Sequence, residues 1–372
     1  MLHPMHLHPF PSALVRGLRW LLPCLGFAAL GLAADANSTF TFKRGVNISH
    51  WLSQNNETRP YAADWFTDED VNWIAAQGFD HIRYPIDGRL WLRPDGSLDD
   101  EKIAPFVQAL EWTREQGLGA ILDMHFLPGA SFDPGAEDRA AFTDETIQAG
   151  VVEFWRAVAR RFASEGDYLR FEVLNEPIAA DNRQLNPFNR RILEAVRESN
   201  PTRIVYLTSN MYGSFKTVSD LELPDDPNIA LTLHYYEPMI FTHQRASWTR
   251  LPDDMPLVPF PGRVPDLTGS VPPDHFTGNV SGRELTVAAI DADFETVARW
   301  AAQHLKGREL HIGEFGAYDR APADSRQRYV SAVARAAERH GWGWAIWDYQ
   351  GGFAVRNRDG EPTEILRGLL PR

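Results

Sequence analysis

The sequence predicts an α/β fold, a single (β/α)8 (TIM) barrel with one long insertion after its sixth strand, from three observations. Short apolar runs alternate with amphipathic stretches from residue 40 to the end of the chain. The apolar runs lack a polar face, which is typical of parallel strands buried on both sides. These runs number eight, which fits a closed barrel, with a doubly wound open sheet as the alternative.

The individual elements follow from local signals. Acidic residues after Thr67 mark a helix N-terminus, where negative charge complements the helix dipole. Gly78 and Gly117 follow helical stretches and can adopt the positive φ of a helix C-terminus. We expect strands at residues 42–47, 81–84, 120–124, 171–174, 204–207, 230–234, 310–313 and 343–347. We expect helices at residues 68–77, 103–116, 147–164, 187–199, 294–304 and 323–339.

Residues 237–285 depart from this alternation. They are rich in Pro, Asp and Gly, show no sustained period and contain several aromatic residues. A loop this long in a compact domain is usually functional or mobile, and one that follows the sixth strand rises from the barrel face where active sites lie. Because the strand–helix pattern resumes afterwards, we interpret the segment as an insertion over the site and not as a linker to a second domain.

Composition and charge narrow the class of protein. Hydrophobic residues make up 44% of the chain and charged residues 23%, which is close to the globular average and predicts a packed core. The formal net charge of −13 argues against nucleic acid or an anionic membrane surface as a partner. A neutral substrate and a monomeric protein are what we expect instead.

The first 36 residues have the features of a signal peptide. Arg16 and Arg19 form a positive region, residues 21–32 an apolar run, and residues 34–36 an A-x-A cleavage pattern. The apolar run is shorter than the roughly 20 residues that span a bilayer, so we expect cleavage and not a retained anchor. The protein would then be secreted or periplasmic, with residues 37–372 as one domain. Cleavage would also remove Cys24, the single cysteine, and leave no disulfide.

Nearly every expected strand ends in a polar or aromatic residue. The ends of parallel strands meet at one face of a barrel, so these residues would lie together although they are far apart in the sequence. Each one alone is compatible with a core or surface role, but their shared position indicates a site. They are Asn47, His50, Trp51, Arg83, His125, Asn175, Glu176, His234, Tyr236, Glu314 and Trp347.

Glu176 and Glu314 are the two glutamates of this set. A carboxylate that follows an apolar strand is costly to bury unless it is paired, so its presence suggests chemistry. Hydrolysis of a glycosidic bond needs two carboxyl groups beside the bond, and a separation of about 5–5.5 Å lets one of them attack the sugar with retention of configuration. A salt-bridged structural pair is the alternative interpretation.

Seven short motifs at the expected strand ends carry a more specific signal. They are Arg-Gly-Val-Asn (44–47), Ile-Arg-Tyr-Pro (82–85), Asp-Met-His (123–125), Leu-Asn-Glu-Pro (174–177), His-Tyr-Tyr (234–236), Gly-Glu-Phe-Gly (313–316) and Trp-Asp-Tyr (347–349). In this order they resemble glycoside hydrolase family 5, the large cellulase family of clan A barrel glycosidases. Any one motif is weak, but the ordered set is specific and covers essentially the whole of residues 37–372.

The resemblance implies roles for the two glutamates and their neighbours. Glu176 corresponds to the general acid/base, which needs a raised pKa, and Glu314 to the nucleophile, which must be ionised. Arg83 and Tyr236 correspond to residues that hydrogen-bond the nucleophile, and the guanidinium would hold the pKa of Glu314 down.

The resemblance also implies substrate contacts. Asn175 would bind the 2-hydroxyl of the sugar at the cleavage point, and Trp347 would stack on that sugar. His125 and His234 would line the same subsite. His50, Trp51 and Trp91 are weaker candidates for neighbouring subsites, with core packing as the alternative for both tryptophans. In the insertion the candidates for the wall are Phe241, His243, Gln244 and Trp248, with a stabilising plug as the alternative.

The activity implied by the resemblance is that of a retaining endo-β-glucanase acting on β-1,4 bonds of a β-glucan. A β-1,3-glucanase or β-mannanase of the same family is the alternative, since residues 44–52 and 123–129 are similar to the exo-β-1,3-glucanase branch. A glycan-binding barrel without activity is a further alternative. Neither a metal nor a cofactor is expected, because the sequence has no HExxH motif, no clustered Cys and no acidic calcium loop.

Overall fold

The computed structural model describes residues 40–370, except residues 56–60, 94, 131–137 and 272–279. The expected signal peptide at residues 1–36 therefore lies outside the described residues. In the part that is described, no helix is both long and apolar enough to cross a membrane.

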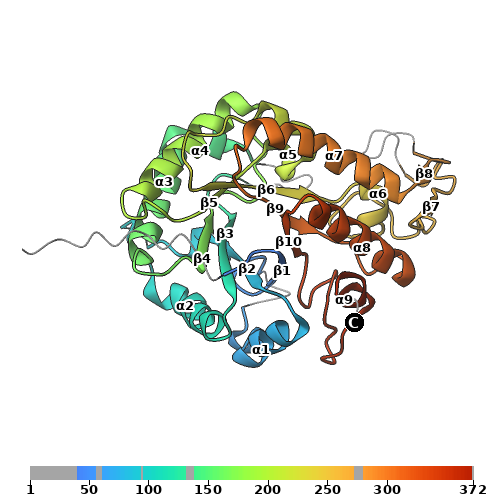
Figure 1. Cartoon of the computed structure of the whole chain (residues 1–372), viewed down its shortest axis with the longest axis horizontal. Coiled ribbons are helices and arrows are strands. Elements are labelled where there is room, and N and C mark those ends of the chain that lie inside the picture. Colours follow the sequence, from blue (N-terminus) through green and yellow to red (C-terminus); the bar gives the residue numbers. More distant parts are fainter. Residues whose placement is uncertain (1–39, 56–60, 94, 131–137, 272–279, 371–372) are drawn as a thin grey trace, which may run out of the picture. The chain divides into compact units, whose positions relative to one another are not determined.

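Eight parallel strands close into a barrel around the centre of the domain (Figure 1). Neighbouring strands follow the order β1-β2-β3-β4-β5-β6-β9-β10, and β10 pairs with β1 through Val46 and Ile346. This closure confirms the predicted barrel and shows that the open-sheet alternative is wrong. The strands are β1 (Arg44–Asn47), β2 (His81–Asp87), β3 (Gly119–Phe126), β4 (Leu169–Glu172), β5 (Val205–Thr208), β6 (Ile229–Tyr235), β9 (Leu310–Phe315) and β10 (Gly343–Ile346).

Helices surround the barrel, and each of the six predicted helices is present. Those helices are α1 (Asp68–Gln77), α2 (Asp100–Glu115), α3 (Glu145–Arg161), α4 (Asn182–Arg197), α7 (Val287–His304) and α8 (Ala323–Arg339). Helices α1 and α8 match the prediction, whereas the other four begin earlier. Asp99, Asp144 and Asp181 explain three of these starts, because each side chain accepts a backbone N–H of the first helical turn.

The end of the barrel where the strands begin is closed by tightly packed rings. His81 and His311 meet through their Nε2 atoms at 2.9 Å, and the ring of Phe42 lies 5.3 Å from that of His81. Gly343 is required beside them, since an added Cβ would lie 1.9 Å from the carbonyl oxygen of Phe42. The opposite end of the barrel is therefore the end that is open to a ligand.

The insertion after β6 is a folded segment. It contains the short helix α6 (Met239–Thr242) and an antiparallel pair, β7 (Gly262–Arg263) with β8 (Glu284–Leu285), which lies to the side of the barrel in Figure 1. Phe241 and Phe260 pack on Tyr329 of α8 at 5.2 Å between ring centroids. The insertion is thus attached to the barrel by an apolar contact of its own.

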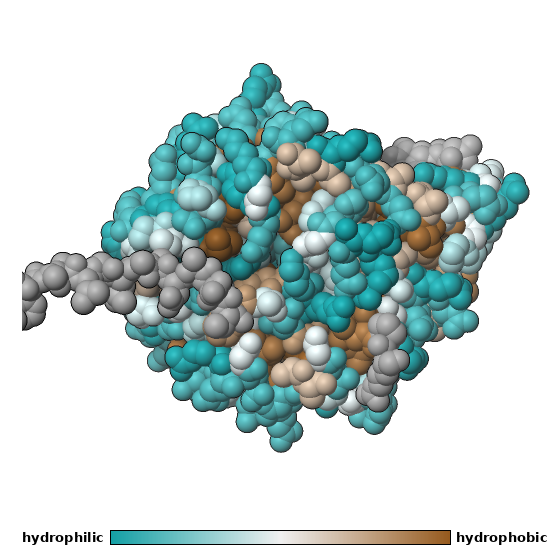
Figure 2. Space-filling view, viewed as in Figure 1, coloured by the Kyte–Doolittle hydropathy of each residue, from teal (hydrophilic) through white to brown (hydrophobic). Residues whose placement is uncertain are grey.

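The remaining elements are short. The 3-10 helices are Ala63–Trp65, Gly88–Leu90, Ala140–Phe142 and Phe215–Asp220, and the short α-helices are α5 (Asn210–Gly213) and α9 (Glu364–Leu369). The face of the molecule shown in Figure 2 is mainly hydrophilic, with smaller apolar areas between the helices. This distribution agrees with apolar side chains being collected in the barrel and beneath the helices.

Candidate active site

A cavity of about 1430 Å³ lies over the ends of the strands. Its wall brings together residues at or just after the ends of β3, β4, β6, β9 and β10, which are far apart in the sequence. Among the residues in its lining are seven of the predicted site residues: His50, His125, Glu176, His234, Tyr236, Glu314 and Trp347. The strand-end pattern seen in the sequence therefore corresponds to one cavity.

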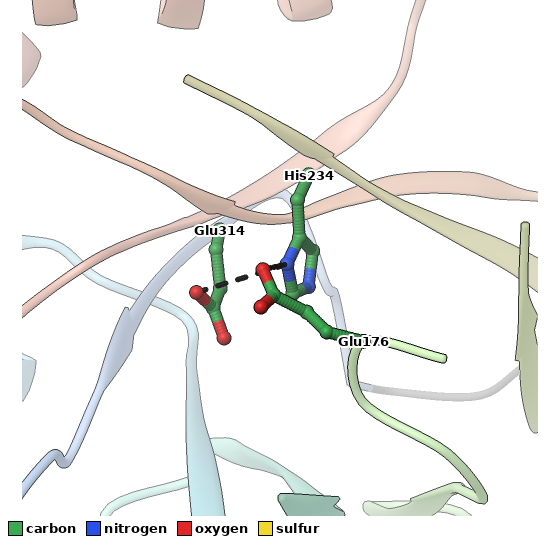
Figure 3. A group of neighbouring side chains, drawn as sticks. All are labelled: Glu176, His234 and Glu314. Atoms are coloured by element: carbon green, nitrogen blue, oxygen red, sulfur yellow. Dashed lines mark hydrogen bonds and ion pairs between the residues drawn. The ribbon is translucent and has the colours of Figure 1, made fainter. Parts of the chain in front are cut away.

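Glu176 and Glu314 face each other across the floor of this cavity, with His234 beside them (Figure 3). One carboxylate oxygen from each glutamate and one ring nitrogen of His234 all lie within 4.8 Å of one another. The Nδ1 atom of His234 is 2.8 Å from Oε1 of Glu176 and 3.7 Å from Oε2 of Glu314. The two glutamates are therefore close enough to act on one bond.

Glu314, at the end of β9, is held on both of its oxygens. Nη1 of Arg83 donates to Oε1 at 2.8 Å, and the hydroxyl of Tyr236 donates to Oε2 at 3.0 Å. Both hydrogen bonds were expected from the sequence. Burial raises the pKa of Tyr236 well above its usual value, so this hydroxyl stays protonated and remains a donor.

The pKa of Glu314 differs from the expectation. We expected the guanidinium of Arg83 to hold it down, and Arg83 and His234 do lower it. Burial outweighs them, so the pKa of Glu314 lies above its usual value. Its ionised form is thus maintained by specific hydrogen bonds in a site that otherwise disfavours charge.

Glu176 lies in the loop after β4 and has the protonation that an acid catalyst needs. Burial raises its pKa to about 7, so below that pH it is a neutral carboxylic acid with a proton to donate. Burial also lowers the pKa of His234 to about 4, so the imidazole beside it is neutral and leaves the proton on Glu176.

Trp347 forms a flat wall of the cavity with His125 behind it. The two rings are stacked, with centroids 5.3 Å apart and planes 7° from parallel. The peptide bond between Trp347 and Asp348 is cis. Asp348 fixes the following loop, since it accepts hydrogen bonds from Ser49 and from the backbone N–H groups of Gly351 and Phe353. Trp347 is therefore anchored from both sides.

Arg83 and Asn175 lie beneath the cavity floor instead of in its lining. Nη2 of Arg83 donates to Oδ1 of Asn175 at 2.7 Å, and Nη1 donates to Oδ1 of Asn47 at 2.8 Å. The Nδ2 atom of Asn175 has no hydrogen-bond partner in the described residues. This buried donor is consistent with the predicted contact to a sugar hydroxyl, which stays a prediction.

Two predicted tryptophans are not part of the cavity. Trp51 is buried in the core, where its ring packs on Phe66 and Tyr84 at 5.2 and 6.4 Å. Trp91 is buried beside Phe106, 5.6 Å away. The cause at Trp51 is local: His50 adopts a φ of 58° and lines the cavity, and the chain then carries the next side chain into the core.

The insertion contributes to the cavity wall with two of the four predicted residues. His243 and Trp248 line the cavity. Phe241 and Gln244 are fully buried, and the Gln244 amide bonds to the backbone of Val258 through both its nitrogen and its oxygen. Both interpretations of this segment thus hold in part: some residues form the wall and others stabilise the loop.

Two buried acids near the site were not predicted. Asp123 and Glu172 are paired across β3 and β4 and are fully excluded from solvent. Both contact Arg83, through Nη2 at 3.0 Å from Oδ2 of Asp123 and 2.7 Å from Oε1 of Glu172. The sequence did contain a signal for them, since each is an acidic residue inside an otherwise apolar strand. A carboxylate can be buried in such a strand only if it is paired, for example with a cation.

Within the described residues, Glu176, His234 and Glu314 are also the group near enough to hold a metal ion. The oxygens of Glu314 already accept from Arg83 and Tyr236, Glu176 is hydrogen-bonded to His234, and a cation there would stand next to the guanidinium of Arg83. We therefore keep the expectation that the site works without a resident metal.

Comparison with known proteins places this geometry in context. A model of the family Cellulase (glycosyl hydrolase family 5) matches residues 43–352. Endoglucanase C of Acetivibrio thermocellus is 29% identical over 341 residues, which cover 89% of this chain and 98% of that protein. Cellodextrinase A of Ruminococcus flavefaciens is 28% identical over 301 residues, or 80% and 82% of the two chains. The structure of a hyperthermophilic endo-beta-1,4-glucanase in complex with substrate matches with a TM-score of 0.72 and 26% identity, covering 89% of this chain and 97% of the other.

Proposed function

The chain belongs to the cellulase family, glycosyl hydrolase family 5, and from this premise we propose that it is an endo-β-glucanase that cleaves β-1,4-glucosidic bonds with retention of configuration. It is a glycoside hydrolase on a (β/α)8 barrel. The bond that it cleaves and the stereochemistry are the proposed part. Glu176 is the proposed acid/base and Glu314 the proposed nucleophile.

The observation that carries the proposal is the approach of the two carboxyl groups. An oxygen of Glu176 and an oxygen of Glu314 lie within 4.8 Å of each other. Inverting glycosidases separate these groups by about 6.5–9.5 Å, because a water molecule must fit between the carboxylate and the sugar. A spacing this short favours direct attack by a carboxylate and therefore retention.

In the first step, Oε of Glu314 attacks the anomeric carbon of the sugar beside Trp347. The bond from that carbon to the bridging oxygen breaks, and Glu176 gives its proton to this oxygen as it leaves. The products of the step are a glycosyl ester of Glu314 and the free end of the glucan. Preorganised donors on Glu314 stay in place throughout, so little reorganisation accompanies the reaction.

In the second step, Glu176 is a carboxylate and takes a proton from water while the water oxygen attacks the anomeric carbon. The ester bond breaks, Glu314 is released as a carboxylate, and Glu176 is again protonated. Glu314 is neutral while esterified, and loss of its negative charge lowers the pKa of Glu176, which suits its change from acid to base.

The size of the cavity supports a glucan chain as substrate. A volume of about 1430 Å³ exceeds the roughly 300–1,000 Å³ of typical small-ligand pockets, so several sugar units fit. The names of the relatives, endoglucanase and cellodextrinase, agree with a β-1,4-glucan. We propose endo action for the same two reasons, the size of the cavity and the names of the relatives.

The test is release of reducing sugar from carboxymethylcellulose, barley β-glucan, laminarin and mannan. Activity on the first two, lost in the Glu314→Gln variant, is expected. Activity confined to laminarin or mannan would show that the substrate is a β-1,3-glucan or a mannan. No activity on any of the four would favour a barrel that binds glycans without cleaving them. Proton NMR of the first product should show the β-anomer; an initial α-anomer contradicts retention.

We also propose that the protein is secreted or periplasmic. The support is the basic and apolar pattern of residues 1–36 and their A-x-A end. N-terminal sequencing of the exported protein should then begin at Asn37. Recovery of the protein with Met1 in place, or only from the cytoplasm, would refute this proposal.

A further inference from the structure

Among the described residues, Arg83 is in contact with three carboxyl groups, two beneath the cavity floor and that of Glu314 in the floor itself. Glu172 takes two of its donors, with Nε to Oε2 at 2.8 Å and Nη2 to Oε1 at 2.7 Å. Glu314 takes Nη1 at 2.8 Å, and Oδ2 of Asp123 lies 3.0 Å from Nη2. The side chains of Asp123 and Glu172 are 0% exposed and that of Glu314 is 6% exposed.

The groups that face Asp123 compensate its charge only in part, because it shares Arg83 with two other acids. Arg83 faces it from β2, His125 from the same strand and Glu172 from β4, and Glu176 repels it from the loop after β4. Glu314 on β9 and His234 on β6 lie across the floor. Burial lowers the pKa values of both histidines to about 4, so they are neutral near pH 7.

Ionisation of all four acids (Asp123, Glu172, Glu176 and Glu314) would therefore put four negative charges against one positive charge in a largely buried site. Unpaired buried charge is strongly unfavourable, so the cluster retains protons near neutral pH. Two of the four have clear support for the ionised form: Glu172 forms a two-point contact with Arg83, and Glu314 accepts from Arg83 and Tyr236. Asp123 and Glu176 remain to hold the protons.

Asp123 is the less well satisfied as a carboxylate. Its Oδ2 atom meets His125 Nδ1 at 2.9 Å and shares Nη2 of Arg83, while its Oδ1 atom has no hydrogen-bond partner in the described residues. Burial raises the pKa of Asp123 to about 7, the same region as that of Glu176. Two mutually repelling groups that titrate together lose their protons in two separate steps.

We propose that Asp123 is a positioning residue for the catalytic proton: it gives up its own proton inside the same buried group of acids as Glu176, and its negative charge then holds the proton on Glu176 to higher pH. This inference rests on the proposed function, and it explains the pH above which the proposed activity is lost. Asp123 touches neither substrate nor reacting atoms, and it acts through Glu176 and His125.

The same proton sets the hydrogen bonding of His125. When Asp123 is ionised, Nδ1–H of the neutral ring donates to it, and the other ring nitrogen is an acceptor. When Asp123 is protonated, its hydroxyl donates to Nδ1, and the other nitrogen carries the hydrogen. A change at Asp123 is thereby passed to a residue that lines the cavity.

The test compares pH profiles of kcat/KM for the parent protein and Asp123→Asn on a cello-oligosaccharide, whose leaving group needs acid catalysis. The variant keeps the shape of the side chain and never ionises. We expect its alkaline limb to move to lower pH by about one unit, because no anion then holds the proton on Glu176. The acidic limb should not move, since Asp123 is protonated there already. A fall in kcat at every pH with both limbs unmoved would show a merely structural role and overturn the proposal.

An aryl cellobioside with a good leaving group is the matched control substrate. Its cleavage does not need the proton of Glu176, so the shift between parent and variant should vanish in kcat/KM. A shift of equal size on this substrate would overturn the proposal. No turnover of either substrate by the parent protein would instead refute the proposed function, so the two failures are distinct.

The parent protein provides a second measurement if Asp123→Asn does not fold, which thermal unfolding will show. Coupled loss of two protons makes the alkaline limb on the cello-oligosaccharide shallower than a single ionisation allows. A limb that follows one ionisation over its whole length contradicts the sharing of protons between Asp123 and Glu176.

Discussion

The floor and the wall of the cavity are built in different ways. At the strand ends, the single side chain of Arg83 donates to four buried residues, which are Asn47, Glu172, Asn175 and Glu314. In the wall supplied by the insertion, Trp248 is 45% exposed and contacts its neighbours by ring edges. The groups proposed to react are thus fixed by hydrogen bonds at the strand ends, whereas the proposed contacts to the rest of the substrate come from the insertion.

This division has a physical basis. A hydrogen-bonded residue at a strand end is held by the register of its neighbours, as in the pairing of Asn47 with Arg83 across β1 and β2. A loop residue is held only by its own packing, and loops accept changes in sequence more easily. Changes on the floor should therefore alter the rate, and changes in the wall should alter substrate affinity.

Among changes that test this difference between floor and wall, the largest loss of activity is expected for Glu176→Gln. Without the acid, kcat on a cello-oligosaccharide should fall by about 10²–10⁴, the usual contribution of general acid–base catalysis. An aryl cellobioside with a good leaving group should lose far less in its first step. Steady-state kinetics on both substrates measure this, and equal losses on the two would contradict the role of Glu176 as the acid.

The pH profile follows from the same residue. The pKa of Glu176 is raised to about 7 by burial, and its protonated form is the proposed acid. Activity on the cello-oligosaccharide should accordingly be present below this pH and fall as the pH rises through it. An alkaline limb that persists unchanged in Glu176→Gln would assign that limb to another group.

A smaller effect, on stability, is expected from Gly313→Ala directly beneath the floor. An added Cβ would lie 2.5 Å from Oγ1 of Thr232 and 3.2 Å from Nε2 of His234. Overpacking of this kind costs about 1–3 kcal/mol and would also displace His234, so kcat should fall with the free energy of unfolding. Urea unfolding and kinetics measure the two quantities.

Gly150→Ala is the matched control for that variant. Gly150 lies within α3, and an added Cβ there meets no atom within 4 Å. Replacing glycine inside a helix should raise the free energy of unfolding by up to about 1 kcal/mol and leave kcat unchanged. Equal destabilisation by both substitutions would show that the floor is no more tightly packed than the outer helices.

The same comparison explains which parts could be predicted from sequence. The strands and the cavity residues could be predicted from the sequence because apolar runs end at polar residues, as at His125 and Glu314. Asp123 and Glu172 also left a signal, an acid within an apolar strand, but its meaning depends on a cation from another strand. The helix starts moved to Asp99, Asp144 and Asp181 because N-capping lies outside the apolar period that marks a helix.

Trp51 and Trp248 show where sequence reasoning ends. Both follow a strand and both are aromatic, yet Trp51 is 2% exposed and Trp248 is 45% exposed. The direction of each side chain depends on a turn, such as the positive φ of His50, and on the packing of segments distant in sequence. A single sequence gives the type of residue in the wall but not the side to which it points.

The smallest effect is expected for Trp248→Ala. Its ring lies edge-on to Tyr318, with centroids 4.7 Å apart, and the ring lines the cavity. An aromatic contact to a sugar ring at this exposed position should contribute about 0.5–1.5 kcal/mol, so KM for barley β-glucan should rise about 2- to 10-fold with kcat unchanged. Trp248 lies in the insertion and makes no hydrogen bond to either proposed catalytic glutamate, whose hydrogen bonds come from Arg83, Tyr236 and His234, so affinity and not rate should change.

Leu257→Ala separates loss of a substrate contact from disturbance of the insertion. Leu257 is 47% exposed in the same segment but is not part of the cavity lining, so its loss should leave KM unchanged. The aryl cellobioside, which is shorter, should distinguish the two variants less than the polymer does. If Trp248→Ala instead lowered kcat as strongly as a change on the floor, the insertion would belong to the reacting part of the site, and the division between floor and wall would fail.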